Sequence, residues 1–287
     1  GFAGLSAARR LTQLSGRGER ILLLEAGRIG EGPAGRNSGF MIDLPHLLSS
    51  DDYAGNLEND RTQLALNRRA IEFALDAGDE YAMDDEIISQ SGKINGAATA
   101  RGMAANIAYA HHLDRLGESY ELLDAAQMQA RCGTGYYRHG LFTPGTVMLH
   151  PAAYVRGLAE GLSHRVRICD DSPVLQMQHS HGIWQARTAG GAVSAPRVIM
   201  AMNGHIESFG FFKRLLVHLF LYASMSEALD SDAVARLGGA PRWGVTPSDP
   251  IGSTIRRISG RSGDRIIVRN QSTYASNMEL PDRLAAR

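Results

Sequence analysis

The first 27 residues constrain the fold most, because they carry the spacing of a dinucleotide-binding βαβ unit. Gly1 and Gly4 open an Ala- and Leu-rich segment, residues 2–14, that we expect to be a helix. An Ile and Leu run, residues 21–24, then leads into the acidic residue Glu25. An acidic residue about 20 positions after such glycines is typical of the Rossmann fingerprint. The pattern predicts an α/β protein whose first strand precedes the sequence, as in a truncated chain.

These residue types suit a bound pyrophosphate. Gly1 would let the backbone approach the phosphates, Gly4 would let the helix pack on the strand, and the helix N-terminus offers unpaired N–H groups and partial positive charge. Glu25 would accept hydrogen bonds from ribose hydroxyls, and its charge disfavours the 2′-phosphate of NADP. The glycines alone also allow an ordinary helix start in another α/β protein.

Length and charge exclude several classes of function. With 287 residues and 44% hydrophobic content, the chain is long enough for about two domains. Its 30 basic and 30 acidic residues create no overall field that selects nucleic acid or an anionic membrane. The longest apolar run, residues 215–225, is too short to span a bilayer. We expect a cytoplasmic protein with a small, locally bound ligand.

The cysteines and histidines do not indicate a metal site. Cys132 and Cys169 lack C-x-x-C spacing, and we expect both to be reduced thiols. His111 and His112 are adjacent, so on a helix they point in different directions. No metal is therefore predicted.

Residues 27–39 form a loop with five glycines. Ordering so much glycine is costly, which favours close contact between its backbone and a ligand, although a flexible surface loop remains open. Glu25-Ala26-Gly27 followed by Ala34-Gly35-Arg36-Asn37-Ser38-Gly39-Phe40 resembles the flavin-contacting loop of FAD-dependent oxidases related to D-amino-acid oxidase and glycine oxidase, closest to the gamma-glutamylputrescine oxidoreductase branch. The resemblance implies FAD, with segment 36–39 against the pyrophosphate and the isoalloxazine ring. The implied contacts here are Gly1, Gly4, Glu25, Ala26, Arg36, Asn37, Ser38 and Gly39.

A second block of sequence continues the resemblance. Residues 166–169 read as a strand, residues 172–188 as a β-meander, and residues 192–205 as an apolar strand that runs into small residues. This order resembles the second half of an FAD-type Rossmann domain. It implies that the main chain of Val174 meets the adenine, while its side chain packs in the core. Ala201, Asn203 and Gly204 would lie under the phosphate and ribitol.

The remaining segments complete the first domain and predict a second. We expect one or two helices within residues 51–83, short strands within 84–95, a helix over 96–116 and a short helix that begins after Asp124. Pro151 suits the first turn of another helix. The predicted fold is α/β: a Rossmann-like FAD domain with a parallel sheet and a meander, interleaved with a mixed, largely antiparallel α+β substrate domain. The FAD domain takes residues 1–83 and 149–208, and the substrate domain takes 84–148 and 209–287, without its C-terminal completion.

Strands are expected at 217–225, 243–245, 253–258 and 265–269, and by resemblance their sheet covers the flavin. Its inward polar residues would line the substrate pocket, which makes Tyr222, Arg256 and Arg257 candidates, although each equally suits a solvent-facing position. His46 and Asp43 follow the flavin loop and would border the active site. His46 could take up a proton near neutral pH, or could be an ordinary loop histidine.

The resemblance implies oxidation of a substrate C–N bond by hydride transfer to FAD, with an amine or amino acid as substrate and oxygen or another molecule as electron acceptor. A homo-oligomer is compatible with the sequence. Two alternatives remain open: an NAD-linked dehydrogenase that uses only the first βαβ unit, and a truncated, non-catalytic chain that no longer binds flavin.

Overall fold

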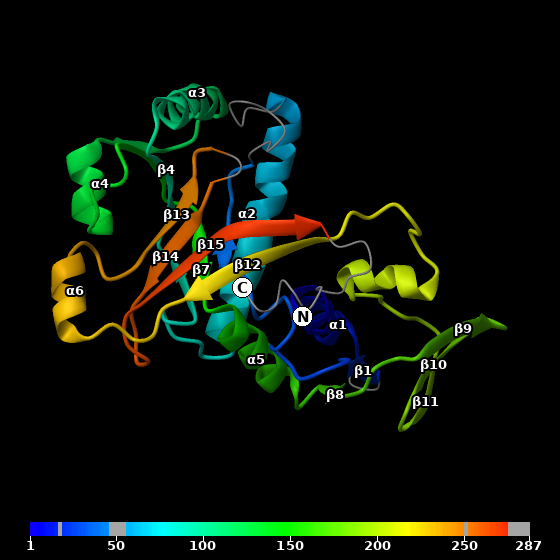
Figure 1. Ribbon diagram of the computed structural model, residues 1–287. Helices are drawn as coiled ribbons and strands as arrows, with labels where there is room; N and C mark the ends of the chain where they lie inside the picture. The colour runs from blue at the N-terminus through cyan, green and yellow to red at the C-terminus, as the bar shows by residue number, and fades with distance from the viewer. Residues whose placement is uncertain (17–18, 46–55, 250–251, 275–287) are drawn as a thin grey trace.

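The computed structural model describes residues 1–16, 19–45, 56–249 and 252–274 of the 287-residue chain. A large mixed sheet with helices on both faces forms one part, and a short parallel sheet with two covering helices forms the other (Figure 1).

The short parallel sheet contains the strand predicted at residues 21–24. β1 (Ile21–Leu24) pairs in parallel with β8 (Val166–Cys169), so that Ile21 lies opposite Val166 and Leu24 opposite Cys169. Parallel neighbours need a crossover connection, and here the crossover holds everything between these two strands. This arrangement brings the ends of the two segments to one edge, where a ligand of an α/β sheet is expected.

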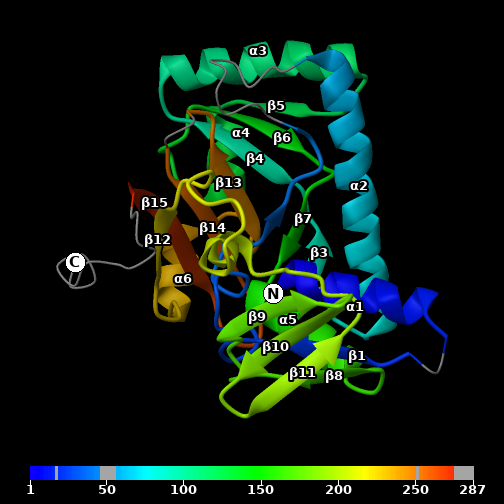
Figure 2. The ribbon, with the colours of Figure 1, turned by 90° about the vertical axis from the view of Figure 1, so that its right-hand side faces the viewer.

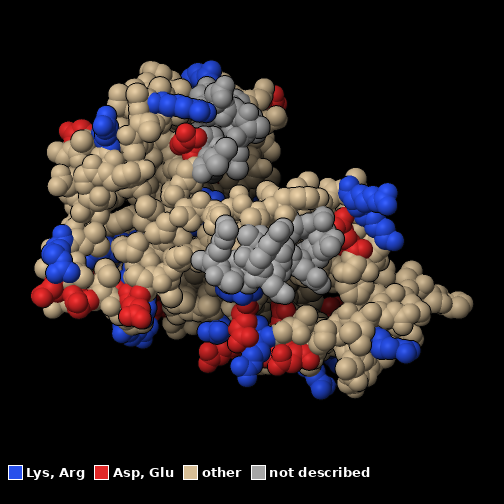
Figure 3. Space-filling model, viewed as in Figure 1, with Lys and Arg blue, Asp and Glu red and all other residues tan. Residues whose placement is uncertain are grey.

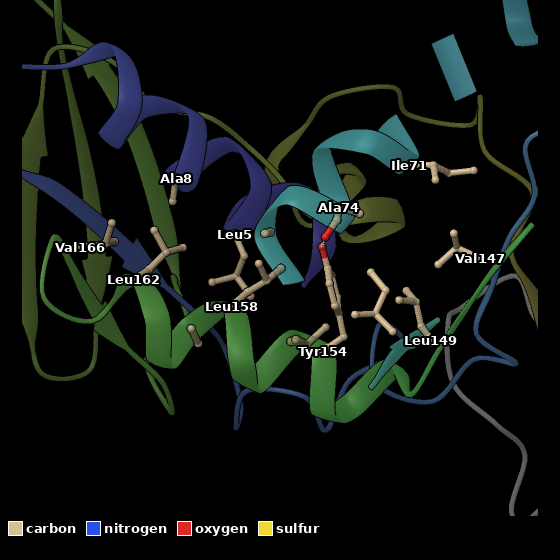
Figure 4. Close-up of a cluster of buried hydrophobic side chains, with 14 residues drawn as sticks. Leu5, Ala8, Ile71, Ala74, Val147, Leu149, Tyr154, Leu158, Leu162 and Val166 are labelled. Atoms are coloured by element: carbon tan, nitrogen blue, oxygen red, sulfur yellow. Dashed lines mark hydrogen bonds between the residues drawn. The ribbon is translucent and has the colours of Figure 1, made fainter. Parts of the chain in front are cut away.

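Two helices cover this sheet. α1 (Phe2–Leu14) and α5 (Pro151–Leu162) pack against each other and against β1 and β8. α5 begins at Pro151, where no backbone donor is needed, and the His150 ring accepts a hydrogen bond from the Ala153 N–H. Figure 4 shows the buried cluster between these helices and α2 (Leu57–Glu80), which includes Leu5, Ala8, Ile71, Ala74, Leu158, Leu162 and Val166. Complete burial of each large side chain contributes about 1.5–3 kcal/mol.

A three-stranded antiparallel meander follows β8. It consists of β9 (Gln176–Ser180), β10 (Ile183–Thr188) and β11 (Gly191–Ala195), in the order β11-β10-β9. The two ribbon views place it at the opposite end of the molecule from α3 (Ala100–Leu116) (Figures 1 and 2).

The large sheet has seven strands in the order β12-β15-β14-β13-β4-β6-β5. β4 and β13 pair in parallel, and the other neighbours are antiparallel. In chain order the strands are β4 (Lys93–Ala97), β5 (Glu121–Leu123), β6 (His139–Thr143), β12 (Leu219–Met225), β13 (Trp243–Pro247), β14 (Thr254–Ile258) and β15 (Arg265–Tyr274).

Alternation along the strands divides this sheet into two faces. On one face, Leu141 of β6 packs with Tyr109 and Leu113 of α3. On the other, Ile94 of β4 packs with Met128 and Cys132 of α4 (Ala125–Cys132). α6 (Ser231–Leu237) lies at the end of the sheet near β14, and Figure 1 shows it below α4.

A small sheet joins the two parts of the fold. It contains β2 (Phe40–Met41), β7 (Val147–Leu149) and β3 (Ile88–Gln90), in the order β2-β7-β3. The side chains of Phe40 and Met148 lie directly against Gly244 of β13. The segment that follows the glycine-rich loop is therefore packed on the face of the large sheet that carries α3.

The start of α4 offers a direct test of local stability. The Asp124 carboxylate accepts a hydrogen bond from the Gln127 N–H, and the Gln127 side chain accepts one from the Asp124 N–H. We expect Asp124→Ala to lower the free energy of unfolding by about 1 kcal/mol, because this capping box is lost. Urea denaturation measures the change, and Asp76→Ala, at an exposed position inside α2, is the control. Equal stability of the two variants would contradict the prediction.

The structure confirms the predicted fold class and corrects one strand. Residues 196–202 form no strand in the part of the chain that the structure describes, and residues Asn203–Phe209 form a 3₁₀ helix, η1, in place of the expected turn. Val198 and Ile199 are exposed. In the described part of the chain, the parallel sheet contains only β1 and β8, and neither of them pairs with residues 196–202. The predicted helices in 51–83 appear as the single helix α2, and the positions before 56 lie outside the described residues.

Charges of both signs are interspersed on the face shown in Figure 3, in keeping with the balanced composition. Within the described ranges, no helix combines the length and apolar character that crossing a membrane requires.

Candidate dinucleotide site

The N-terminus of α1 lies at the centre of the candidate site. Gly1 is the N-cap and provides no side-chain hydrogen bond, so the first N–H groups of the helix remain available to a ligand. A Cβ on Gly4 would lie 3.5 Å from the Cβ of Ala201, and one on Gly1 would lie 3.1 Å from the Cβ of Ala34. Three separate segments therefore meet at the start of this helix.

Glu25 follows β1 directly, as the fingerprint predicts. Its carboxylate accepts hydrogen bonds from the N–H groups of Ala26 at 3.0 Å and Gly27 at 3.5 Å, and Oε2 lies 3.5 Å from the Gly1 nitrogen. The acidic side chain is thus held beside the helix N-terminus, in a position suited to ribose hydroxyls.

The glycine-rich loop is built from consecutive turns. The Gly35 N–H donates to the carbonyl of Gly32, and the Arg36 N–H donates to that of Pro33. The Asn37 side chain accepts from the Gly39 N–H at 2.9 Å and donates to the Ala34 carbonyl at 2.7 Å. Asn37 therefore orders the loop from within.

Within the described residues, the exposed Arg36 guanidinium has no hydrogen-bond or ion-pair partner. A free guanidinium in this loop would suit a phosphate group.

The second block of sequence reaches the same place. The Ser172 N–H donates to the Glu25 carbonyl at 2.9 Å, and the Asp171 N–H donates to that of Gly27 at 3.0 Å. These bonds bring the half-buried Val174 close to the end of β1. Ala201 lies against Gly4, and Asn203 and Gly204 follow it at the start of η1. The structure thus brings Glu25, Ala34 and Ala201, which lie far apart in the sequence, to the start of α1.

The predicted substrate residues are placed separately. Tyr222 of β12 is half-buried, and its hydroxyl forms a 2.7 Å hydrogen bond with Thr273 on β15. Arg256 of β14 is buried and donates hydrogen bonds to the carbonyls of Ser38 and Leu149. Among the described residues, no hydrogen bond connects Arg256 with Tyr222. His46 lies outside the described residues.

Neighbouring arginines of β14 point to opposite faces, as adjacent strand residues must. Arg257 donates to the carbonyls of Gly238 and Ala240 and pairs with Asp264 at 3.3 Å. These contacts lie on the face of the sheet opposite to the one that Arg256 and the glycine-rich loop share. We therefore assign Arg257 a structural role and withdraw it as a substrate candidate.

A buried polar cluster around Lys93 was missed from the sequence. Lys93 is buried, and its ammonium donates to Asn95 and, at 3.3 Å, to Thr246. Burial lowers the pKa of Lys93 to about 8, while the negative charge of Asp43 acts in the opposite direction. Asp43 follows β2 and lies 3.5 Å from the Arg68 guanidinium. Lys93 and Asn95, two polar residues two positions apart in β4, were the available signal.

A metal site has no support in the described part of the chain, where no group of three His, Cys, Asp or Glu side chains is placed to hold an ion.

The fold is α/β, and the start of α1 together with Glu25 has the geometry of a candidate dinucleotide site. Residues 1–278 match the family described as DAO, FAD dependent oxidoreductase. The chain belongs to this family, which implies FAD as the cofactor.

Individual relatives agree with this assignment. A probable oxidoreductase OrdL from Haemophilus influenzae is 28% identical over 212 residues, which are 72% of this chain and 48% of that protein. Gamma-glutamylputrescine oxidoreductase from Escherichia coli is 26% identical over 209 residues, again 72% and 48% of the two chains. The chain thus spans about half the length of these curated relatives.

Solved structures show the same fold. Glycine oxidase from Geobacillus kaustophilus superposes with a TM-score of 0.68 at 17% identity, covering 95% of this chain and 68% of that one. L-proline dehydrogenase from P. horikoshii gives a TM-score of 0.67 at 13% identity, with 93% and 67% covered. The fold predicted by resemblance is confirmed.

Proposed function

We propose that this chain binds FAD and forms part of an enzyme that oxidises the C–N bond of an amine or amino acid. The observation that carries the proposal is the meeting of three features: the uncapped N-terminus of α1, the carboxylate of Glu25 and the small residues Ala34 and Ala201. The free guanidinium of Arg36 follows two positions after Ala34 in the chain. Together they offer hydrogen-bond donors and positive charge for a pyrophosphate, and an acceptor for a ribose.

The substrate class is proposed from the relatives. One is a gamma-glutamylputrescine oxidoreductase, and solved structures with the same fold include glycine oxidases and an L-amino acid deaminase. With the family resemblance, these relatives support the proposal of a gamma-glutamylputrescine-like amine, an N-alkyl amino acid or a D-amino acid as substrate.

The chain's residues would divide the work as follows. Gly1, Gly4, Ala201, Asn203 and Gly204 would surround the phosphates and ribitol, Val174 would present its main chain to the adenine, and Ala26 and residues 36–39 would border the flavin. Bound FAD supplies the acceptor for a hydride equivalent. The large sheet would cover the ring and exclude water, which favours oxidation of the neutral amine.

On that sheet, Tyr222 and Arg256 remain the proposed residues near the substrate, and His46 the proposed proton acceptor. The product imine would then be hydrolysed by water, and oxygen or another acceptor would reoxidise the cofactor. The division into interleaved FAD and substrate domains is part of the same proposal.

The visible spectrum of the purified chain after addition of FAD tests the proposal. We expect flavin absorption bands that remain after gel filtration and that bleach anaerobically with an amine of the proposed class. A protein that stays colourless would instead support a chain that has lost flavin binding. Retention of NAD and not of FAD would support the dehydrogenase alternative, which the family assignment disfavours.

Glu25 allows a sharper test of cofactor orientation. We expect Glu25→Gln to weaken FAD binding by about tenfold, because charged hydrogen bonds to the ribose are replaced by neutral ones. Quenching of flavin fluorescence measures the affinity. Glu31→Gln, at an exposed position six residues later in the glycine-rich loop, is the matched control and should bind like the wild type. Equal affinities of the two variants would count against the ribose contact.

A further inference from the structure

Arg256 connects three distant parts of the chain. Its side chain is 8% exposed, and Nη1 donates to the Ser38 carbonyl at 3.0 Å and to the Leu149 carbonyl. Ser38 belongs to the glycine-rich loop, and Leu149 ends β7. One guanidinium nitrogen thus ties the loop to both the large and the small sheet.

The backbone around Gly39 is shaped to allow this contact. Gly39 has a φ of +75°, its N–H donates to the Asn37 side chain, and its carbonyl accepts from the Leu149 N–H at 2.7 Å. A Cβ at this position would lie 2.4 Å from Arg256 Nη1 and 2.3 Å from the Leu149 oxygen. The arginine can therefore reach the loop only because residue 39 has no side chain.

The environment of Arg256 differs from that of an ordinary structural arginine. No carboxylate among the described residues forms an ion pair with it, whereas Arg257 beside it pairs with Asp264. Burial, together with the nearby positive charge of Arg242, lowers the pKa of Arg256 to about 10, so it stays charged at neutral pH. Burying an unpaired charge is costly, and the contacts that offset the cost are those to the loop and β7.

We propose that Arg256 is a positioning residue that fixes the Ser38 carbonyl and the Gly39 peptide, and so holds segment 36–39 in its ligand-binding conformation before the ligand arrives. The naming of that ligand as FAD rests on the proposed function. A substrate contact alone would leave the free loop unchanged, which separates this role from direct binding of substrate by Arg256.

Hydrogen–deuterium exchange on the full chain without added FAD tests the holding of the loop directly. We compare Arg256→Gln and Arg256→Lys with Arg257→Gln, which removes an equally buried arginine with similar carbonyl contacts on the other face. Loss of a charged hydrogen bond should raise exchange at residues 36–41 by about tenfold in Arg256→Gln, and leave it near wild type in Arg257→Gln. Arg256→Lys keeps the charge and should give a smaller increase in exchange. If Arg256→Gln does not fold, Arg256→Lys is compared with Arg257→Gln in its place.

Titration with FAD completes the test. We expect Arg256→Gln to bind FAD about tenfold more weakly, with a shifted flavin spectrum, while Arg257→Gln binds like the wild type. Wild-type exchange at residues 36–41 in both folded Arg256 variants would overturn the proposal, whatever their activity. Failure of the wild-type chain to bind FAD would instead overturn the proposed function, and the exchange result would still decide whether Arg256 holds the loop.

Discussion

Replacing Gly35 with alanine should weaken FAD binding by up to about a hundredfold, because forcing a methyl group into space already filled costs about 1–3 kcal/mol. A Cβ on Gly35 would lie 1.8 Å from the Gly30 oxygen and 2.7 Å from its carbonyl carbon. Both are backbone atoms, so the clash cannot be relieved by turning a side chain. The loop must open, and Arg36 and the following residues must move with it.

The same loop provides the control for this substitution. A Cβ on Gly32 would meet no atom within 4 Å, and its φ is not positive. Gly32→Ala should therefore bind FAD within about twofold of the wild type, in line with the small effects of most surface substitutions. Isothermal titration with FAD measures both variants. Equal binding by Gly35→Ala and Gly32→Ala would show that the turn between residues 30 and 35 does not shape the site.

Removing the charge of Lys93 should change how stability depends on pH. Burial lowers the pKa of Lys93 from an ordinary value of 10.5 to about 8 in the folded chain. Between these values the unfolded chain binds more protons than the folded chain, so this residue makes stability rise with pH. The gain is complete above the unfolded pKa and is lost as the pH falls through about 8. From about pH 7 to 9.5 it amounts to about 2 kcal/mol.

Lys93→Met should abolish this rise. Urea denaturation at several pH values measures the free energy of unfolding of the wild type and the variant. The difference between the two isolates the contribution of Lys93, because the other charged groups near the cluster, Asp43, Arg68 and Glu118, are common to both. The exposed Lys213, the other lysine of the chain, gives the control Lys213→Met, which should keep the wild-type slope. Buried Tyr154, whose pKa is raised to about 12, acts oppositely in more alkaline solution, so the comparison stops near pH 9.5. Parallel curves for wild type and Lys93→Met would contradict the assignment.

Local sequence patterns predicted the cofactor side of the molecule well. Helical spacing and a glycine N-cap located α1, an apolar run located β1, and Glu25 follows that strand as expected. These features depend on neighbours a few positions apart, which a single sequence displays directly. The domain boundaries, and the roles assigned to individual residues, stay predictions.

Long-range contacts explain what the sequence did not predict. The residues next to Lys93 in the sequence do not predict its hydrogen bond to Thr246 or the nearby charge of Asp43. The residues next to Arg256 likewise do not predict its hydrogen bond to Ser38. The apolar residues Val198 and Ile199 are typical of a buried strand. A strand also needs a hydrogen-bonded neighbour, and an apolar run in the sequence does not show whether one is present. Arg256 and Arg257 look equivalent in sequence, and only the register of β14 gives them different faces.

The parallel pairing of β4 with β13 has a consequence for how the chain folds during synthesis. β4, β6 and β5 can pair as soon as they leave the ribosome, whereas Lys93 and Thr246 are 153 positions apart. At about 5–20 residues per second, the edge of β4 waits roughly 10–30 seconds for its neighbour. Throughout that interval it presents unpaired backbone groups, which are a template for pairing with other chains and so favour aggregation of the nascent chain.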